Sequence, residues 1–193
     1  FMLLHAMLSL VISRHSNSDD IVIGTPVANR MQVELEPLIG FFVNTLVLRT
    51  DTNHETLDDY LSHVKDVNLD AQSHQDIPFE QLVEHCEVVR SLKHSPLFQI
   101  MFTMDTNEVN GSELTDVRFS PLGGADVVSK FELDIGADFS KEGTNISWTY
   151  DKALFTEESI QRLSEHYKRL LISLTESTGS RISDLQMLST DEV

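Results

Sequence analysis

Two β-rich runs constrain the fold of this chain more than any other feature. The first covers residues 21–30 and the second covers residues 39–49, and both are rich in β-branched and aromatic residues. Polar side chains interrupt these runs where a core strand would place apolar residues. Burying an unpaired polar group costs about 1–3 kcal/mol, so such groups need hydrogen-bond partners. The pattern predicts two strands that carry polar side chains into a structured interior or cleft: Asn29, Arg30, Asn44 and Thr45.

The rest of the sequence predicts further helices and strands. Hydrophobic spacing predicts a helix over residues 1–15, a single helical turn over 34–38 and a helix that ends near Ser73. Thr52 and Glu55 fit a capping box at the start of this last helix. A shorter helix is expected to begin at Pro78, and a long one after Thr156. Four more strands are expected over residues 98–104, 117–122, 131–139 and 145–150.

This order of elements predicts one α/β domain. No Gly/Ser-rich linker or internal repeat divides the chain. We therefore expect a two-layer αβ sandwich, in which a mixed sheet is covered mainly on one face by helices. After Gly179 the tail is polar, but Ile182, Leu185 and Leu188 can dock on the body of the domain.

Composition excludes several classes of function. With 40% hydrophobic residues among 193, the chain can bury a core. Its net charge of -17 argues against binding to nucleic acid or to an anionic membrane. The acidity then serves either a solvated surface or attraction to a basic partner. The single cysteine, Cys86, follows a helical apolar pattern and is expected to be a core residue, and a cytoplasmic location is expected.

The sequence contains no recognisable self-contained active site. It has no Gly-x-Ser-x-Gly elbow, no phosphate-binding glycine loop and no dinucleotide-binding fingerprint. Eight histidines are present, but His63 and His74 lie eleven residues apart, which is too long a spacing for a single metal ion. No metal site and no directly bound cofactor are expected.

Four segments in order resemble the signature motifs of nonribosomal peptide synthetase condensation domains. Residues 23–30 read Ile-Gly-Thr-Pro-Val-Ala-Asn-Arg and residues 39–46 read Ile-Gly-Phe-Phe-Val-Asn-Thr-Leu. Residues 74–83 read His-Gln-Asp-Ile-Pro-Phe-Glu-Gln-Leu-Val and residues 95–102 read Ser-Pro-Leu-Phe-Gln-Ile-Met-Phe. The resemblance covers essentially the whole chain.

The resemblance implies half of a V-shaped domain with the chloramphenicol acetyltransferase-like fold. The active-site motif of the family, His-His-x-x-x-Asp-Gly, belongs to the first half and does not occur in this sequence. Residues 1–180 therefore resemble the C-terminal subdomain, and residues 181–193 resemble the start of a linker toward a following adenylation domain. Such a chain is expected to be inactive alone, within a parent enzyme that forms amide bonds by acyl or peptidyl transfer.

The same resemblance implies roles for individual residues, none of them catalytic. Arg30 matches the arginine thought to pair with the aspartate of the missing motif and so to support the catalytic loop. Asn44 either lines the substrate tunnel or satisfies buried backbone groups, and Thr45 is a second candidate for the tunnel wall. Four residues are candidates for bridging the two halves: Pro78, Phe79, Pro96 and Phe98.

The implied partners are the N-terminal half of the domain, the donor and acceptor carrier proteins and the following adenylation domain. The substrates would arrive as thioesters on the phosphopantetheine arms of the carrier proteins. An exposed apolar docking face is also expected to favour self-association. Alternatives are a non-catalytic docking module for carrier proteins or neighbouring domains, and an epimerization-type relative, although the Pro-Val-Ala-Asn-Arg form favours peptide-bond formation. A coenzyme A-dependent acyltransferase would need a catalytic histidine that we do not find.

Overall fold

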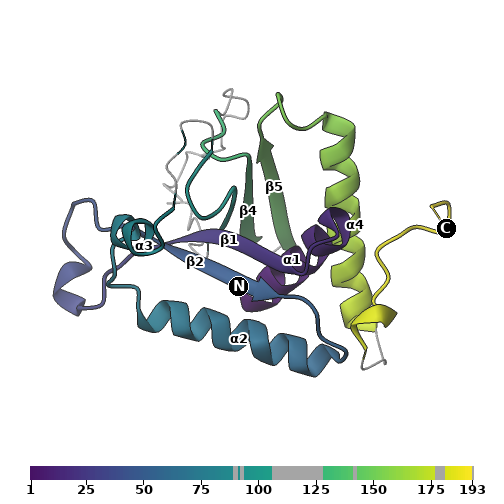
Figure 1. Ribbon diagram of the computed structural model, residues 1–193, viewed down its shortest axis with the longest axis horizontal. Helices are drawn as coiled ribbons and strands as arrows, with labels where there is room; N and C mark the ends of the chain where they lie inside the picture. Colours follow the sequence, from purple (N-terminus) through teal and green to yellow (C-terminus); the bar gives the residue numbers. More distant parts are fainter. Residues whose placement is uncertain (89–90, 92–93, 106–127, 141–142, 177–180, 193) are drawn as a thin grey trace, which may run out of the picture.

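The computed structural model describes residues 1–88, 91, 94–105, 128–140, 143–176 and 181–192. The described helices are α1 (Met2–Ser16), α2 (Leu57–Ser73), α3 (Phe79–His85) and α4 (Glu157–Glu176), and short 3-10 turns cover Val33–Leu35 (η1) and Ile182–Asp184 (η2). The described strands are β1 (Asp20–Val27), β2 (Asn44–Asp51), β3 (Ile100–Asp105), β4 (Leu133–Ser140) and β5 (Gly143–Tyr150) (Figure 1).

The strands form one mixed sheet in the order β2-β1-β3-β4-β5. The outer pairs, β1 with β2 and β4 with β5, are antiparallel. The inner pairs, β1 with β3 and β3 with β4, are parallel. Parallel neighbours need long connections, and the connection from β1 to β3 runs through β2, α2 and α3. The expected mixed sheet is confirmed.

One face of the sheet carries the hydrophobic core. Ile23 pairs with Leu48 on one side and with Ile100 on the other, so these side chains share a face. The same face continues through Ile135 on β4. Helices α1, α2 and α4 pack their apolar residues on it in a single cluster. The opposite face has no comparable helix layer in the described residues, and the expected two-layer sandwich is confirmed (Figure 1).

Helix α1 is the centre of the helix layer. Tyr60 of α2 donates a hydrogen bond to the carbonyl of Ala6 at 2.6 Å, and Tyr167 of α4 donates one to the carbonyl of Leu4 at 3.0 Å. Both phenols are buried, which raises the pKa of each above its usual value. Each flanking helix is thus fixed to α1 by a buried aromatic ring whose polar tip is satisfied.

Helix α2 begins later than predicted. Its N-cap is Thr56, whose side-chain oxygen accepts a hydrogen bond from the amide of Asp59 at 3.1 Å. The prediction of a cap at Thr52 is wrong, because the Thr52 hydroxyl bonds to Ser13 at 2.7 Å and to the Asp19 carbonyl. Thr52 therefore ties β2 to α1 instead of starting a helix.

Other boundaries also differ from the expectations. The second strand begins at Asn44, because the preceding residues form an exposed loop. The helical turn expected over residues 34–38 lies slightly earlier, in η1. The strand expected over residues 117–122 falls outside the described residues. Cys86 is exposed, so its assignment to the core is wrong: α3 is short and buries only Val83.

The Phe98 ring covers Gly24 on the face away from the helices. Phe98 is 1% exposed, and a Cβ atom built on Gly24 would lie 2.4 Å from its ring. Only a glycine allows the ring to lie this close to β1. The residues around Phe98 are thereby held against the sheet. Among the described ranges, no helix has the length and apolar character needed to cross a bilayer.

We predict that Gly24→Ala destabilises the protein by about 1–3 kcal/mol, because the added methyl group overlaps the Phe98 ring. Urea unfolding measures the loss. Gly136→Ala is the control, since its Cβ would meet only the Ser147 hydroxyl, at 2.7 Å, which can rotate away. Phe98→Leu should make Gly24→Ala less costly in a double-mutant cycle, and strictly additive effects would contradict the contact.

Candidate functional site

Arg30 lies at the base of the loop that joins β1 to β2. Its guanidinium carbon is 4.2 Å from the centre of the Phe42 ring, which places the cation over an aromatic face. Its Nη1 donates to the carbonyl of Leu35 and to that of Glu36 at 3.4 Å. No carboxylate pairs with Arg30 within the described part of the chain. Arg30 thus folds the loop on itself while its side chain stays half-buried.

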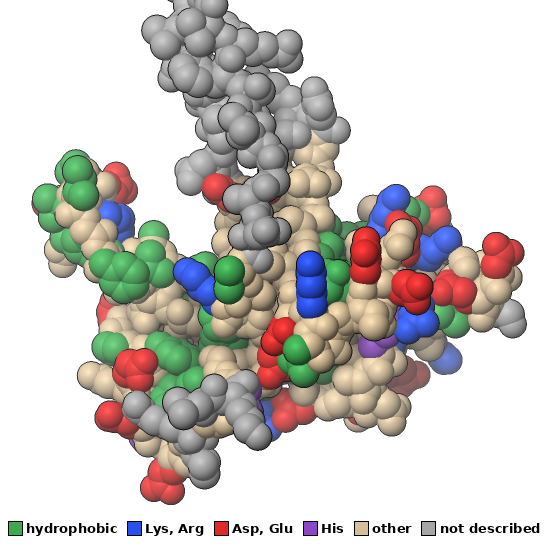
Figure 2. Space-filling model, turned by 90° about the horizontal axis from the view of Figure 1, so that it is seen from above, with side chains coloured by type: hydrophobic (Ala, Val, Ile, Leu, Met, Phe, Trp, Pro, Cys, Tyr) green, Lys and Arg blue, Asp and Glu red, His purple; other side chains and the backbone are tan. Residues whose placement is uncertain are grey.

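The loop beyond Arg30 is an exposed apolar arm, here defined as residues 31–43. Ile39 is fully exposed and Phe41 is 92% exposed. The arm projects from the sheet beside α3 and forms the lobe on the left of Figure 2, where green side chains gather. Exposed patches of this kind mark interaction sites. The other large apolar residues exposed on the arm are Met31, Val33, Leu38 and Val43.

Asn44 fixes the connection between α2 and α3. Its Nδ2 donates to the carbonyls of Gln75 and Ile77, both at 2.8 Å, and its Oδ1 accepts from the amide of Phe79 at 3.1 Å. Three backbone groups that no regular element satisfies are thereby paired. This geometry favours the backbone-satisfying role, while the tunnel-lining role of Asn44 and of its neighbour Thr45 stays a prediction.

Two of the four bridging candidates meet in an aromatic cluster. The Phe98 ring lies 5.7 Å from Phe79, edge to face, and 5.4 Å from Phe131. Pro96 precedes a tight turn in which the amide of Phe98 donates to the Pro96 carbonyl at 2.9 Å. Pro78 is the N-cap of α3. The cluster adjoins the residues that Asn44 holds, whereas the contacts of Arg30 lie in the apolar arm.

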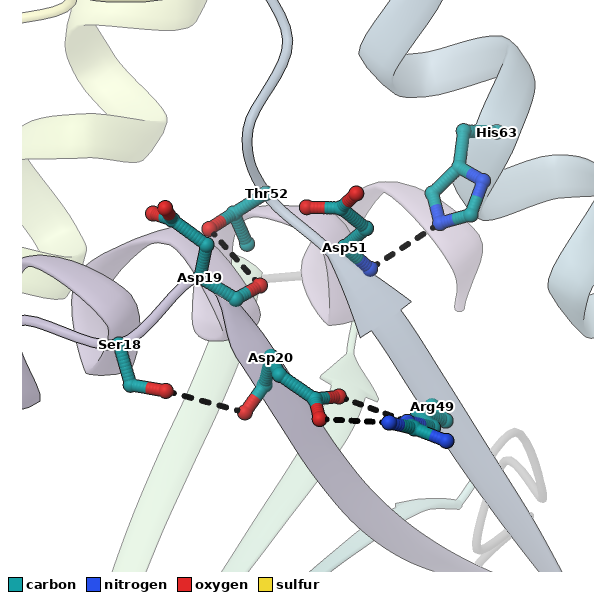
Figure 3. A network of polar contacts seen from close by, with 7 residues as sticks. All are labelled: Ser18, Asp19, Asp20, Arg49, Asp51, Thr52 and His63. Atoms are coloured by element: carbon teal, nitrogen blue, oxygen red, sulfur yellow. Dashed lines mark hydrogen bonds and ion pairs between the residues drawn. The ribbon is translucent and has the colours of Figure 1, made fainter.

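The sequence did not predict the polar network that joins β1 and β2 (Figure 3). Arg49 donates two hydrogen bonds to the Asp20 carboxylate, both at 2.8 Å, and this contact lowers the pKa of Asp20. The amide of Asp51 donates to His63 of α2 at 3.1 Å. The antiparallel pairing of the two strands would have placed Asp20 near Arg49. Both side chains are exposed, so the pair adds little stability.

The described residues contain no group of three or more histidine, cysteine, aspartate or glutamate side chains arranged to hold a metal ion. What they do contain is a set of positioning contacts. Arg30 shapes the arm, Asn44 holds the start of α3, and Phe98 packs on Gly24. Such an arrangement can hold and orient a ligand or another polypeptide.

We predict that Asn44→Ala destabilises the protein by about 1–2 kcal/mol, because it leaves the Phe79 amide and two carbonyls without their partner. Chemical denaturation measures the change. Asn145→Ala is the control, since Asn145 is an exposed residue of β5. Equal stability of the Asn44 variant and the unmodified protein would show that these contacts contribute nothing.

Comparison with known proteins identifies relatives along the whole chain. The family model of the condensation domain matches residues 1–193. The chain is 39% identical to one of the subunits of linear gramicidin synthase from Brevibacillus parabrevis, and it covers 4% of that protein. It is 34% identical to surfactin synthase subunit 2 of Bacillus subtilis (strain 168), of which it covers 5%. The whole chain is aligned in both cases, so it spans a small part of each relative.

Solved structures have the same fold. The X-domain from teicoplanin biosynthesis matches 97% of this chain with a TM-score of 0.82 and 27% identity, and the match covers 44% of the X-domain chain. A four-domain nonribosomal peptide synthetase bound to AMP and glycine matches 98% of this chain with a TM-score of 0.83 and 22% identity, over 16% of its own length. The family match and the chloramphenicol acetyltransferase-like fold both agree with the resemblance that the four motifs in residues 23–102 indicate. The chain belongs to the condensation domain family.

Proposed function

We propose that this chain is the C-terminal part of a condensation domain that joins two carrier-protein-bound thioesters by a peptide bond in nonribosomal peptide synthesis. One observation carries the proposal: the whole chain matches the condensation family but covers only 44% of the X-domain chain. The His-His-x-x-x-Asp-Gly motif is absent from the sequence. The chain would therefore supply one wall of the site, and another part of the parent protein would supply the histidine.

The proposed reaction needs orientation above all. The amine of the acceptor attacks the thioester carbonyl of the donor, and the thiol of the donor phosphopantetheine arm leaves. Holding the two ends in line lowers the barrier, because the encounter becomes effectively intramolecular. This chain offers positioned backbone and aromatic groups around Asn44 and Phe98. Such groups can line the substrate site, but they cannot act as a general base.

Arg30 is proposed to support the catalytic loop of the missing half. Within the described residues its guanidinium contacts only carbonyls and the Phe42 ring, so it retains donors for a carboxylate. A two-pronged pair with the aspartate of the absent motif would lock that loop in place. Thr45, Pro78 and Pro96 are proposed to shape the tunnel and the junction between the two halves.

The proposed partners are the N-terminal half of the domain, the two carrier proteins and an adenylation domain that follows. We propose that residues 1–180 form the subdomain and that residues 181–193 begin the linker toward that domain. The two sequence relatives named above are synthases of linear gramicidin and surfactin, which supports a role in making a secondary metabolite. A cytoplasmic place of synthesis is part of the proposal.

A non-catalytic docking module is the second candidate. One structural neighbour is a complex of the X-domain and OxyB from teicoplanin biosynthesis, and this X-domain is 26% identical to the chain with a TM-score of 0.79. A condensation-type fold can therefore serve as a docking partner. The apolar arm offers an exposed surface for such a contact.

We predict that the chain alone makes no dipeptide from two loaded carrier proteins, and that adding the matching N-terminal half restores synthesis. Arg30→Ala should lower the restored rate about 10- to 100-fold, because a charged hydrogen bond contributes roughly 1.5–3 kcal/mol. Mass spectrometry of the carrier-bound product measures the rate.

Arg49→Ala is the matched control, because Arg49 pairs with Asp20 on the surface and should leave the rate unchanged. Full activity of the Arg30 variant would remove Arg30 from the mechanism. Product formed by the chain alone would refute the division of the site, and no product from both halves with retained carrier binding would favour the docking module.

We predict that the apolar arm drives association of the isolated chain. Light scattering at high protein concentration should show dimers or larger species, and the double variant Ile39→Ser, Phe41→Ser should be monomeric because these side chains are almost fully exposed. Leu154→Ser is the control, since Leu154 is also exposed but lies far along the chain from the arm. A strict monomer of the unmodified chain would contradict the prediction.

A further inference from the structure

The C-terminal end of the chain packs on the helix layer. We call residues 181–192 the C-terminal strap. Leu185 is only 2% exposed and belongs to the main core together with Ile182. Arg14, in the last turn of α1, donates to the carbonyl of Leu185 at 2.7 Å and to that of Ile182 at 2.8 Å. The strap is therefore held by a two-pronged backbone contact as well as by apolar burial.

A chain of hydrogen bonds holds the far end of the strap. His15 follows Arg14 in α1, and its Nε2 lies 2.9 Å from Nδ1 of His166 in α4. The other nitrogen of His166, Nε2, lies 2.9 Å from a carboxylate oxygen of Glu192. The second oxygen of Glu192 accepts from the amide and the hydroxyl of Ser189, both at 2.7 Å. Three elements, α1, α4 and the strap, are linked in this order.

The geometry limits how many protons the hydrogen-bond chain from His15 to Glu192 can hold. His166 is 4% exposed and presents Nε2 to a carboxylate, so this nitrogen carries a hydrogen. The contact between His15 and His166 then holds one hydrogen between two nitrogens. One added proton can be accommodated, because the positive charge faces Glu192. A second added proton would set two N–H groups and two cations against each other and break the contact.

Burial and nearby positive charges also disfavour protonation of His15. The pKa of His15 is lowered, first by partial covering of its ring and then by the positive charges of His166 and Arg162. The groove beside Ser189 and Glu192 is lined by charged residues of α4: Glu158, Arg162, Glu165 and Arg169. Their signs are mixed, whereas Arg162 is the one that acts on His15.

The sign of the pH effect follows from these shifts. A histidine with a lowered pKa stabilises the docked state above its ordinary value of about 6.5, and this contribution is lost as the pH falls below that value. The pKa of Glu192 is lowered to about 2, chiefly by the Ser189 amide and then by His166, so its charge persists through the same range. Mild acid therefore weakens the contact through protonation of His15 and not of Glu192.

We propose that His15, His166 and Glu192 form a proton-sensitive clasp, which holds the C-terminal strap on α1 and α4 near neutral pH and releases it when both histidines are protonated. The clasp uses only contacts within this chain, so it stands independently of peptide-bond formation.

Hydrogen exchange read by NMR tests the clasp on the 193-residue protein. The amides of Gln186 and Ser189 donate to Ser173 and Glu192, so their protection factors report docking. We expect these factors to fall several-fold between about pH 7.5 and about pH 5, on either side of the ordinary histidine pKa, after correction for intrinsic exchange, while amides of β1 and β3 keep theirs. His15→Gln should retain protection in mild acid, because the amide of glutamine can either donate to or accept from Nδ1 of His166 but cannot become a cation.

His85→Gln is the matched control, since His85 is an exposed residue of α3, outside the clasp, and should behave like the unmodified protein. His166→Gln should lower the protection of Ser189 at both pH values. Equal protection at both pH values in the unmodified protein would overturn the proposal. So would a pH effect that survives His15→Gln, or a parallel loss of protection in β1 and β3, because acid would then loosen the whole fold.

Discussion

Burial of α1 between the sheet and two flanking helices organises the whole domain. The helix is apolar on most of its surface, so it must be covered by the sheet as well as by α2 and α4. The hydroxyls of Tyr60 and Tyr167 bind its backbone and fix both neighbours. Arg14 and His15 at its end extend the same dependence to the C-terminal strap.

Covering one face of the sheet with helices decides where function can lie. The other face and the strand ends remain for contacts outside the core, and the family-related residues gather there. Phe98 packs on Gly24, and Asn44, the first residue of β2, holds the start of α3. These contacts fix segments that are distant in sequence against the sheet, which suits a surface that positions another component. The apolar arm projects from the same end of β1 and β2 (Figure 1).

Much of the fold was predictable, because hydrophobic periodicity reports directly on burial. The strand at residues 131–139 alternates, and Leu133, Ile135 and Ala137 are indeed buried. The cap at Thr52 and the burial of Cys86 were predicted wrongly, because each depended on tertiary contacts: Thr52 bonds to Ser13, and α3 is too short to bury Cys86. The polar network around Asp20 and Arg49 required the strand pairing to be known.

The family motifs, the α/β class, the acidity and the lack of a recognisable metal-binding motif can be read from residue types and their spacing. The contacts of the polar residues, in contrast, depend on tertiary packing. Asn44 satisfies three backbone groups because a segment more than 30 residues away approaches it, and Arg30 folds the arm on itself because its own loop turns back toward it. Likewise, His15 lies 151 residues from His166, which lies 26 residues from Glu192, and only packing of α1, α4 and the strap brings the three within hydrogen-bond distance.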